Sequence, residues 1–153
     1  MIEKIQIRKA TAADVPAMHE LIMELALFEK CPDQVTNSPE QLLEDGFGNA
    51  PVYNALVASD ETGKIVGLAL YFIKYSTWRG KGLYLDDLIV TQKYRGQGIG
   101  KKLFTAYRNH AASLGAKQLH WQVLDWNTPA ITFYENEGAS IEAEWWDCKI
   151  NLK

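Results

Sequence analysis

A strand, a glycine-containing turn and a helix follow one another in residues 85–104, and this segment constrains the fold more than any other. It reads LDDLIVTQKYRGQGIGKKLF, an apolar run followed by a basic turn and an amphipathic helical pattern. The glycines at 96, 98 and 100 let backbone N–H groups approach a ligand closely. The start of the helix adds N–H donors without intrahelical acceptors and the positive end of the helix dipole. The segment therefore predicts a loop that binds phosphate.

The spacing of this loop excludes two common nucleotide-binding motifs. A Walker A loop would need a glycine at position 95 and a hydroxyl at position 102, where the chain has Arg95 and Lys102. A dinucleotide fingerprint that begins at position 96 would need a glycine at position 101, which is Lys101. The failed Walker spacing also argues against a nucleotide-phosphate hydrolase.

The size and composition of the chain are those of a globular protein. Of its 153 residues, 47% are hydrophobic and 23% are charged, so we predict one domain over residues 1–153. The net charge of −3 argues against nucleic acid as the main partner. No apolar run approaches the roughly 18 residues of a membrane span, and the N-terminus lacks a signal-peptide pattern. We therefore expect a cytoplasmic protein that does not enter a membrane.

The cysteines and histidines show no metal-binding pattern. Cys31 and Cys148 lie far apart in the sequence, which is typical of reduced thiols rather than of a disulfide framework. His19, His110 and His120 also lack the spacing of metal ligands. We expect no metal site.

Hydrophobic periodicity predicts a mixed sheet with helices packed against it. Hairpin-linked strands precede two strand–helix crossovers, which indicates an α/β protein with a mixed, α+β type of sheet. Thr11 and Asp14 are expected to cap the first helix, and a capping box at Ser38 to start the second, which Gly46 would end. We expect helices to begin after residues 11, 38, 98 and 127, and strands near residues 5–7, 52–58, 65–75, 82–90, 118–124 and, once or twice, 141–152.

Six motifs, spread in order along the chain, resemble those of one enzyme family. The loop Arg95-x-x-Gly98-x-Gly100 resembles the acetyl-CoA loop of the GNAT superfamily of N-acetyltransferases. Within that superfamily the chain is similar to the diamine acetyltransferases, which acetylate spermidine and spermine or, in one relative, thialysine. The resemblance implies a GNAT fold, with splayed fourth and fifth strands and helices on both faces of the sheet. The motifs are EDGFG at 44–48, YSTWRG at 75–80, YLDD at 84–87, YRGQGIG at 94–100, LDWN at 124–127 and FY at 133–134.

The resemblance implies acetyl-CoA as the cosubstrate and indicates which residues would hold it. The backbone of Leu88, Ile89 and Val90 would pair with the pantetheine arm, which Asn127 would also contact. Asn127 is equally well explained as the N-cap of the helix that follows it. The pyrophosphate would lie against Arg95, Gly96, Gln97, Gly98, Ile99, Gly100 and Lys101.

Acetyl transfer from a thioester to an amine needs a neutral amine and a proton for the departing thiolate, but no covalent nucleophile. By the resemblance Tyr134 lies near the sulfur, where a phenol with a pKa of about 10 can protonate the thiolate. Its alternative role is that of a core aromatic residue beside Phe133. Asp86 stands where the spermidine/spermine enzymes use a glutamate, and we expect it to act as the base, although a solvated strand end would also explain it. Asp87 is expected to point to the opposite face of the strand.

The candidate residues for the amine site are acidic, aromatic and hydroxylic. Glu29 aligns with a family carboxylate that binds the far ammonium of a polyamine, and Trp78 with an aromatic residue of the substrate channel. Ser76 replaces an acid of the polyamine enzymes and matches the thialysine-acetylating relative. Glu144 is expected to act across a homodimer interface, as in the family, although surface charge explains Glu29 and Glu144 about equally well. The candidate set is Glu29, Ser76, Trp78, Asp86, Asp87 and Glu144.

The sequence therefore predicts an acetyl-CoA-dependent N-acetyltransferase. It would acetylate a primary amine of a small cationic substrate by direct attack in a ternary complex. The substrate would be a thialysine-like amino acid or a diamine or polyamine, and Ser76 favours the first. The alternative is a non-catalytic acyl-CoA-binding sensor, in which Tyr134 and Asp86 would have no function.

Overall fold

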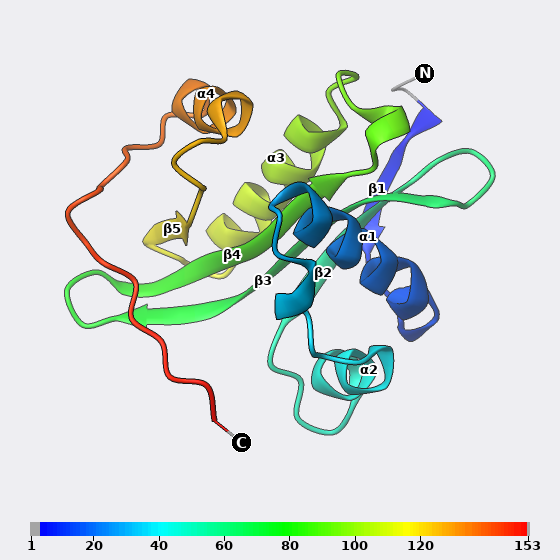
Figure 1. The fold of residues 1–153 in the computed structure, drawn as a ribbon, viewed down its shortest axis with the longest axis horizontal. Helices are drawn as coiled ribbons and strands as arrows, with labels where there is room; N and C mark the ends of the chain where they lie inside the picture. The colour runs from blue at the N-terminus through cyan, green and yellow to red at the C-terminus, as the bar shows by residue number, and fades with distance from the viewer. Residues whose placement is uncertain (1–3, 153) are drawn as a thin grey trace. The chain divides into compact units, whose positions relative to one another are not determined.

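The computed structural model describes residues 4–152 and contains a five-stranded sheet in the order β1-β2-β3-β4-β5. Strands β1 to β4 are antiparallel to their neighbours, whereas β4 and β5 are parallel (Figure 1). The chain forms two compact units, which meet in the sequence between Gln122 and Val123 and are described separately. None of the helices in the described range is long and apolar enough to cross a bilayer.

The observed elements follow the predicted order. The mixed sheet and the four main helices are confirmed, and the differences concern element ends and the C-terminal segment. The strands are β1 Gln6–Lys9, β2 Asn54–Ser59, β3 Ile65–Ser76, β4 Gly80–Val90 and β5 Gln118–Trp121. The helices are α1 Val15–Phe28, α2 Pro39–Phe47, α3 Ile99–Ser113 and α4 Thr128–Asn136, with short 3₁₀ helices η2 Ala12–Asp14, η3 Pro32–Gln34 and η4 Gln92–Tyr94.

The start of α1 is fixed by a partly buried ion pair. The backbone N–H of Thr11 donates to Asp14 Oδ2 at 2.7 Å, which confirms the predicted cap. Arg8 on β1 donates to both carboxylate oxygens of Asp14, at 2.7 and 3.0 Å. The hydrogen bond and charge of Arg8 lower the pKa of Asp14, so this carboxylate is ionised at neutral pH. The first strand is thereby connected to the helix that covers the sheet.

The start of α2 follows half of its predicted capping box. Ser38 Oγ accepts a hydrogen bond from the backbone N–H of Gln41 at 3.0 Å, as expected of an N-cap. The reciprocal bond is not formed, because the Gln41 side chain instead donates to Asp45 Oδ1, one turn later, at 2.9 Å. This part of the prediction is wrong, because the Gln41 side chain extends along the helix toward Asp45 and not back to Ser38, whose N–H its amide oxygen would have to accept.

The prediction that Gly46 ends α2 is also wrong. The helix continues through Phe47, and Gly48 is the capping residue. Gly46 lies inside the helix, where an added Cβ would come within 2.2 Å of the Tyr53 ring. The Tyr53 hydroxyl in turn donates to the Leu42 carbonyl at 2.7 Å. The glycine is therefore needed for packing of α2 against the segment before β2, and not for ending the helix.

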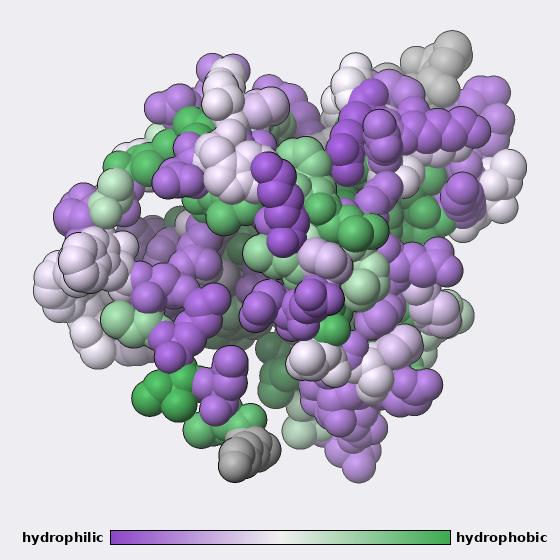
Figure 2. Space-filling model, viewed as in Figure 1, coloured by the Kyte–Doolittle hydropathy of each residue, from purple (hydrophilic) through white to green (hydrophobic). Residues whose placement is uncertain are grey.

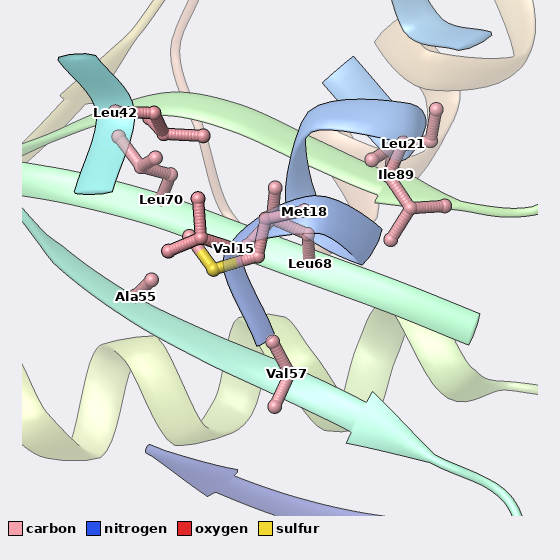
Figure 3. Packing of buried hydrophobic residues seen from close by; sticks show 9 residues of the cluster. All are labelled: Val15, Met18, Leu21, Leu42, Ala55, Val57, Leu68, Leu70 and Ile89. Carbon is pink, nitrogen blue, oxygen red and sulfur yellow. The ribbon is translucent and has the colours of Figure 1, made fainter. Parts of the chain in front are cut away.

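The main core lies between α1, α2 and one face of strands β2 to β4. Figure 3 shows how side chains from the two helices meet those of the strands at this interface. Each fully buried aliphatic side chain of this kind stabilises the fold by about 1.5–3 kcal/mol. The cluster contains Val15, Met18, Leu21, Leu42, Ala55, Val57, Leu68, Leu70 and Ile89.

Helix α3 covers the opposite face of the sheet. Its Leu103, Phe104 and Tyr107 are fully buried, and the Tyr107 hydroxyl donates to the Leu83 carbonyl on β4 at 2.9 Å. Helices therefore cover both faces of the sheet, while the end of the β3–β4 hairpin extends beyond α1 (Figure 1). On the visible surface, hydrophilic and hydrophobic residues are interspersed (Figure 2).

The C-terminal unit contains α4 and no strand within residues 123–152. Asn127 Oδ1 accepts from the backbone N–H of Ala130 at 3.4 Å, which confirms its capping role. The strands predicted in residues 141–152 do not form, and Trp145 and Trp146 are 70% and 88% exposed. An alternating apolar pattern needs a neighbouring strand for its ladder, and residues 123–152 offer none among themselves.

The role assigned to Gly46 is testable by thermodynamics. We expect Gly46→Ala to lower the free energy of unfolding by about 1–3 kcal/mol, because the new methyl group overlaps the Tyr53 ring. Urea denaturation would measure the change. Gly100→Ala is the control, because it also replaces a helical glycine but its Cβ would lie 3.9 Å from Val90, an ordinary contact. Equal stability of the two variants would contradict the packing role.

Candidate active site

The glycine loop is a turn that leads from the end of β4 into the N-terminus of α3. Gly96 and Gly98 have φ angles of +77° and +81°, which side chains rarely tolerate. Gly98 is the N-cap of α3, and its carbonyl accepts the first intrahelical bond, from Lys102, at 3.1 Å. A Cβ at Gly96 would meet no atom within 4 Å, so the outer surface of the loop is open. The predicted strand–loop–helix geometry is confirmed, and phosphate binding stays a prediction.

Arg95 holds the loop in place through its side chain. Its Nε donates to the Val90 carbonyl at 2.8 Å, closing the loop onto the end of β4. Its guanidinium also lies 5.6 Å from the centre of the Phe28 ring, at the end of α1. The arginine of the motif is therefore a structural residue of the loop, whatever further contact it makes with a ligand.

Glu24 on α1 also fixes the loop, and the sequence analysis did not identify it. Its Oε1 accepts from Thr91 Oγ1 at 3.0 Å and, at a longer 3.4 Å, from the backbone N–H of Gln92. Its Oε2 is buried without a hydrogen-bond partner among the described residues. The one signal in the sequence was an acid within the mostly apolar run MELAL of α1, which alone does not identify a partner.

Strands β4 and β5 pair over a short stretch and then separate. The parallel register runs from Gly82 opposite Gln118 to Leu85 opposite Trp121, where β5 ends. β4 continues to Val90, paired with β3 on its other side. Residues 86–90 thus lie beyond the paired stretch, and three predicted cofactor residues, Leu88, Ile89 and Val90, belong to them. The Ile89 side chain is in the core, so any ligand would meet its backbone.

A register shift occurs in β4 where this separation begins. Leu85 lies opposite Tyr71 and Asp87 lies opposite Leu70, so Asp86 is the extra residue of a β-bulge. Opposed residues share a face of the sheet, and Leu70 belongs to the core under α1, so Asp87 lies on the α1 face. The bulge interrupts the period of two at Asp86, so the alternation of Asp86 and Asp87 between faces cannot be taken from their adjacency and stays a prediction.

Three carboxyl groups interact around this bulge. Glu29, which caps the C-terminus of α1, and Asp87 are half-buried, while Asp86 is exposed. Desolvation raises the pKa of Asp87 to about 7, with further contributions from the charges of Asp86 and Glu29. Desolvation and then the charge of Asp86 raise the pKa of Glu29, and desolvation raises that of Asp86. The structure thus places Glu29, Asp86 and Asp87 in one electrostatically coupled group, here called the carboxyl cluster.

Ser76 and Trp78 lie in the turn of the β3–β4 hairpin. Ser76 Oγ accepts from the backbone N–H groups of Trp78 at 3.2 Å and Arg79 at 3.0 Å. The serine that was predicted to affect substrate choice thus has a structural function, because its hydroxyl stabilises the turn. The Trp78 side chain is 85% exposed.

The remaining predicted residues lie in the C-terminal unit. Tyr134 is half-buried on α4 and packs edge-on against Phe133, with 5.4 Å between ring centres. Glu144 is exposed in the segment that follows α4. No group of three or more His, Cys, Asp or Glu residues within 4–152 could hold a metal ion.

Comparisons with known proteins place these features in a family. The acetyltransferase (GNAT) family matches residues 16–139. The thialysine N-epsilon-acetyltransferase of Bos taurus is 43% identical, over 94% of this chain and 90% of that protein. The spermidine/spermine N(1)-acetyltransferase-like protein 1 of Homo sapiens is 38% identical, over 94% of this chain and 22% of that protein. An aminoglycoside acetyltransferase from an uncultured soil metagenomic sample shares the fold, with a TM-score of 0.79, 24% identity and coverage of 99% and 98% of the two chains.

The coupling within the carboxyl cluster can be measured by titration. We expect the Asp87 carboxyl carbon, followed by NMR, to titrate near pH 7, and Asp86→Asn to lower that midpoint by removing a neighbouring negative charge. Glu61→Gln is the control, because it removes a charge from the turn before β3 and should leave the midpoint unchanged. A midpoint near 4 in the wild-type protein would contradict the coupling.

The same shift has a consequence for stability. Because the pKa of Asp87 is higher in the folded than in the unfolded chain, the folded state binds more protons between these two values. The contribution of Asp87 to stability therefore falls as the pH rises from about 4 to about 7 and is constant above that range. In denaturation experiments at several pH values, we expect Asp87→Asn to lack this decline in the free energy of unfolding.

Proposed function

Because the chain belongs to the acetyltransferase (GNAT) family, we propose that it transfers an acetyl group from acetyl-CoA to a primary amine of a small cationic molecule. The observation that carries this proposal is the carboxyl cluster, whose Asp86 and Asp87 lie on β4 just beyond its pairing with β5. A cationic amine suits coupled carboxylates, and an exposed strand edge beside them suits an extended acyl donor. The amine attacks the thioester directly in a ternary complex.

The residues of the loop and of β4 fit the proposed cosubstrate. Acetyl-CoA supplies an activated acetyl thioester and carries a pyrophosphate. The open backbone at Gly96, the positive φ of Gly98 and the N-terminus of α3 favour a phosphate at that position. The backbone of Leu88 and Ile89 lies in the stretch of β4 beyond β5, where an extended arm can pair as a strand does. The Val90 carbonyl already accepts from Arg95.

The carboxyl cluster is the proposed proton acceptor for the amine. An ammonium with a pKa of about 10 must lose a proton before its nitrogen can attack. The sequence analysis favoured Asp86 for this step. Since Asp86 and Asp87 are electrostatically coupled, we propose that the pair takes up the proton as one unit, directly or through water. A pKa of Asp87 near 7 suits a base that works at neutral pH.

Tyr134 is the proposed general acid, assisted by Asn127 in positioning the arm of the donor. As the nitrogen–carbon bond forms and the carbon–sulfur bond breaks, the phenol gives its proton to the departing thiolate. A phenol with a pKa of about 10 is protonated at neutral pH, and a thiol has a pKa of about 8.5. The position of Tyr134 on the helix that Asn127 caps supports the proposal, as does the family membership.

The amine site proposed here includes Glu29 and Asp87 as carboxylates that bind the ammonium groups of the substrate. Trp78, exposed at the hairpin turn, would contact a cation through its ring. The relatives named for thialysine and for spermidine and spermine support acceptors of this kind, either an amino acid with a side-chain amine or a polyamine.

A homodimer is part of the proposal. The segment after α4 carries Trp145 and Trp146 with 70% and 88% of their surface exposed, and exposed aromatic residues of this size favour an interface. Glu144 lies in the same segment and would then reach the amine site of the partner subunit. The cytoplasmic location stays a prediction of the sequence.

An assay with a panel of amines tests the proposed activity. We expect mass spectrometry to detect a singly acetylated product, together with release of free CoA, when acetyl-CoA is supplied with thialysine, ornithine, lysine, putrescine or spermidine. Acetyl-CoA binding without acetylation of any amine would contradict the proposal and would instead indicate a sensor domain.

The role of Tyr134 is tested by removing its hydroxyl. We expect Tyr134→Phe to lower kcat by 10²–10⁴-fold, with little change in the affinity for acetyl-CoA measured by calorimetry. Tyr75→Phe is the control, since this tyrosine is 74% exposed on the β3–β4 hairpin and has no proposed function. An unchanged kcat in Tyr134→Phe would remove the general-acid role.

A further inference from the structure

A row of polar and aromatic side chains continues from the carboxyl cluster along the same face of the sheet. Leu70 lies on the α1 face, so alternation places Phe72 and Lys74 on that face too. Tyr84 is opposite Phe72 in β4, and His120 is opposite Tyr84 in β5. The row therefore crosses three strands. On this face, the pair of Phe72 and Tyr84 is the next pair after that of Leu70 and Asp87.

The contacts between these side chains show that the row is ordered. The rings of Phe72 and Tyr84 are stacked with 5.2 Å between centres, and Tyr84 meets His120 edge-on at 5.1 Å. Lys74 Nζ lies 2.7 Å from His120 Nδ1 and 5.2 Å from the centre of the Tyr84 ring. The Lys74 ammonium is therefore held beside His120 and the Tyr84 ring.

Lys74 has no acidic partner within residues 4–122. Its contacts are the imidazole of His120 and the ring of Tyr84, neither of which neutralises its charge. A positive charge held over aromatic rings and beside an imidazole is a ready site for an anion. The row thus carries a positive end at Lys74 and a negative end at the carboxyl cluster.

The separation of the two ends corresponds to a small molecule. Side chains two residues apart on one strand are about 7 Å apart, and Asp87 and Tyr84 lie opposite Leu70 and Phe72, which are two residues apart on β3. The ammonium of Lys74 lies over Tyr84, so it is about one such step from the carboxyl cluster. A lysine or ornithine molecule in extended form spans a distance of this order between its terminal amine and its α-carboxylate.

We propose that Lys74, positioned by His120 and Tyr84, binds the α-carboxylate of the acceptor, so that the substrate is an α-amino acid with a terminal side-chain amine. The inference rests on the proposed function, since it assigns the reacting amine to the carboxyl cluster. A diamine would present an ammonium group to Lys74 without a compensating carboxylate. The same lysine thus attracts the amino acid and disfavours the polyamine.

The test compares ornithine with putrescine, which differ by the α-carboxylate alone. In the wild-type protein we expect kcat/KM to be higher for ornithine. Lys74→Met should lower the ratio of the two kcat/KM values about tenfold, the effect of losing one charged hydrogen bond, while kcat/KM for putrescine stays the same or rises. Lys74→Arg should restore the preference, because it keeps a donor with positive charge.

The matched control is Lys81→Met, which makes the same change of charge on the opposite face of the same hairpin. Lys81 lies opposite Tyr75 and donates to the Leu114 carbonyl on the α3 side of the sheet. We expect this variant to keep the wild-type ratio. A ratio that is unchanged in Lys74→Met, or lowered equally in Lys81→Met, would overturn the inference while leaving the acetyltransferase proposal intact.

Binding measurements separate this inference from the proposed function. Calorimetric titration of the protein with ornithine and with putrescine, in the presence of CoA, needs no turnover. If no amine of the panel is acetylated, the proposed function fails. Tighter binding of ornithine that is lost in Lys74→Met would still support the carboxylate site, and equal binding of the two amines in the wild-type protein would overturn it.

Discussion

Beyond Leu85, strand β4 has a hydrogen-bonded neighbour on one side only, and the candidate site depends on this condition. β5 ends at Trp121, opposite Leu85, and the extra residue Asp86 follows at once. A bulge within a strand paired on both sides would disrupt two ladders, whereas here it disrupts only the ladder with β3. Because β5 ends here, the bulge disrupts fewer backbone hydrogen bonds. The bulge in turn groups Asp86 and Asp87 with Glu29.

Helix α1 connects the two regions of the site. Glu24 accepts hydrogen bonds from the start of the glycine loop, and Glu29, five residues later at the end of the helix, belongs to the carboxyl cluster. Both positions are set by the packing of α1 on the sheet through residues such as Met18 and Leu21. A change in this packing would move the loop and the carboxyl cluster together, because one rigid helix carries both contacts.

Local patterns were sufficient for much of the fold. Apolar runs bounded by turn residues located β3 and β4, and the buried positions of α3 at Ile99, Leu103 and Tyr107 followed helical spacing. They were insufficient where a distant residue intervened. Gly46 reads as a helix end until the Tyr53 ring is seen against it. Residues 141–152 have the alternation of a strand, but no strand forms in their unit, because a ladder needs a partner that local sequence does not supply.

By itself, the sequence determined the family, the order of the elements and the strand–loop–helix turn at Gly98, because these follow from short-range spacing and from backbone angles that only certain residues adopt. Only the tertiary structure decided the face of Asp87, the coupling of its carboxyl group to Glu29 and the contact of Lys74 with His120. A bulge shifts every later side chain of a strand by one position, and a sequence pattern does not record where that shift falls. The residues that we propose to bind the acceptor are for this reason the ones that required the fold.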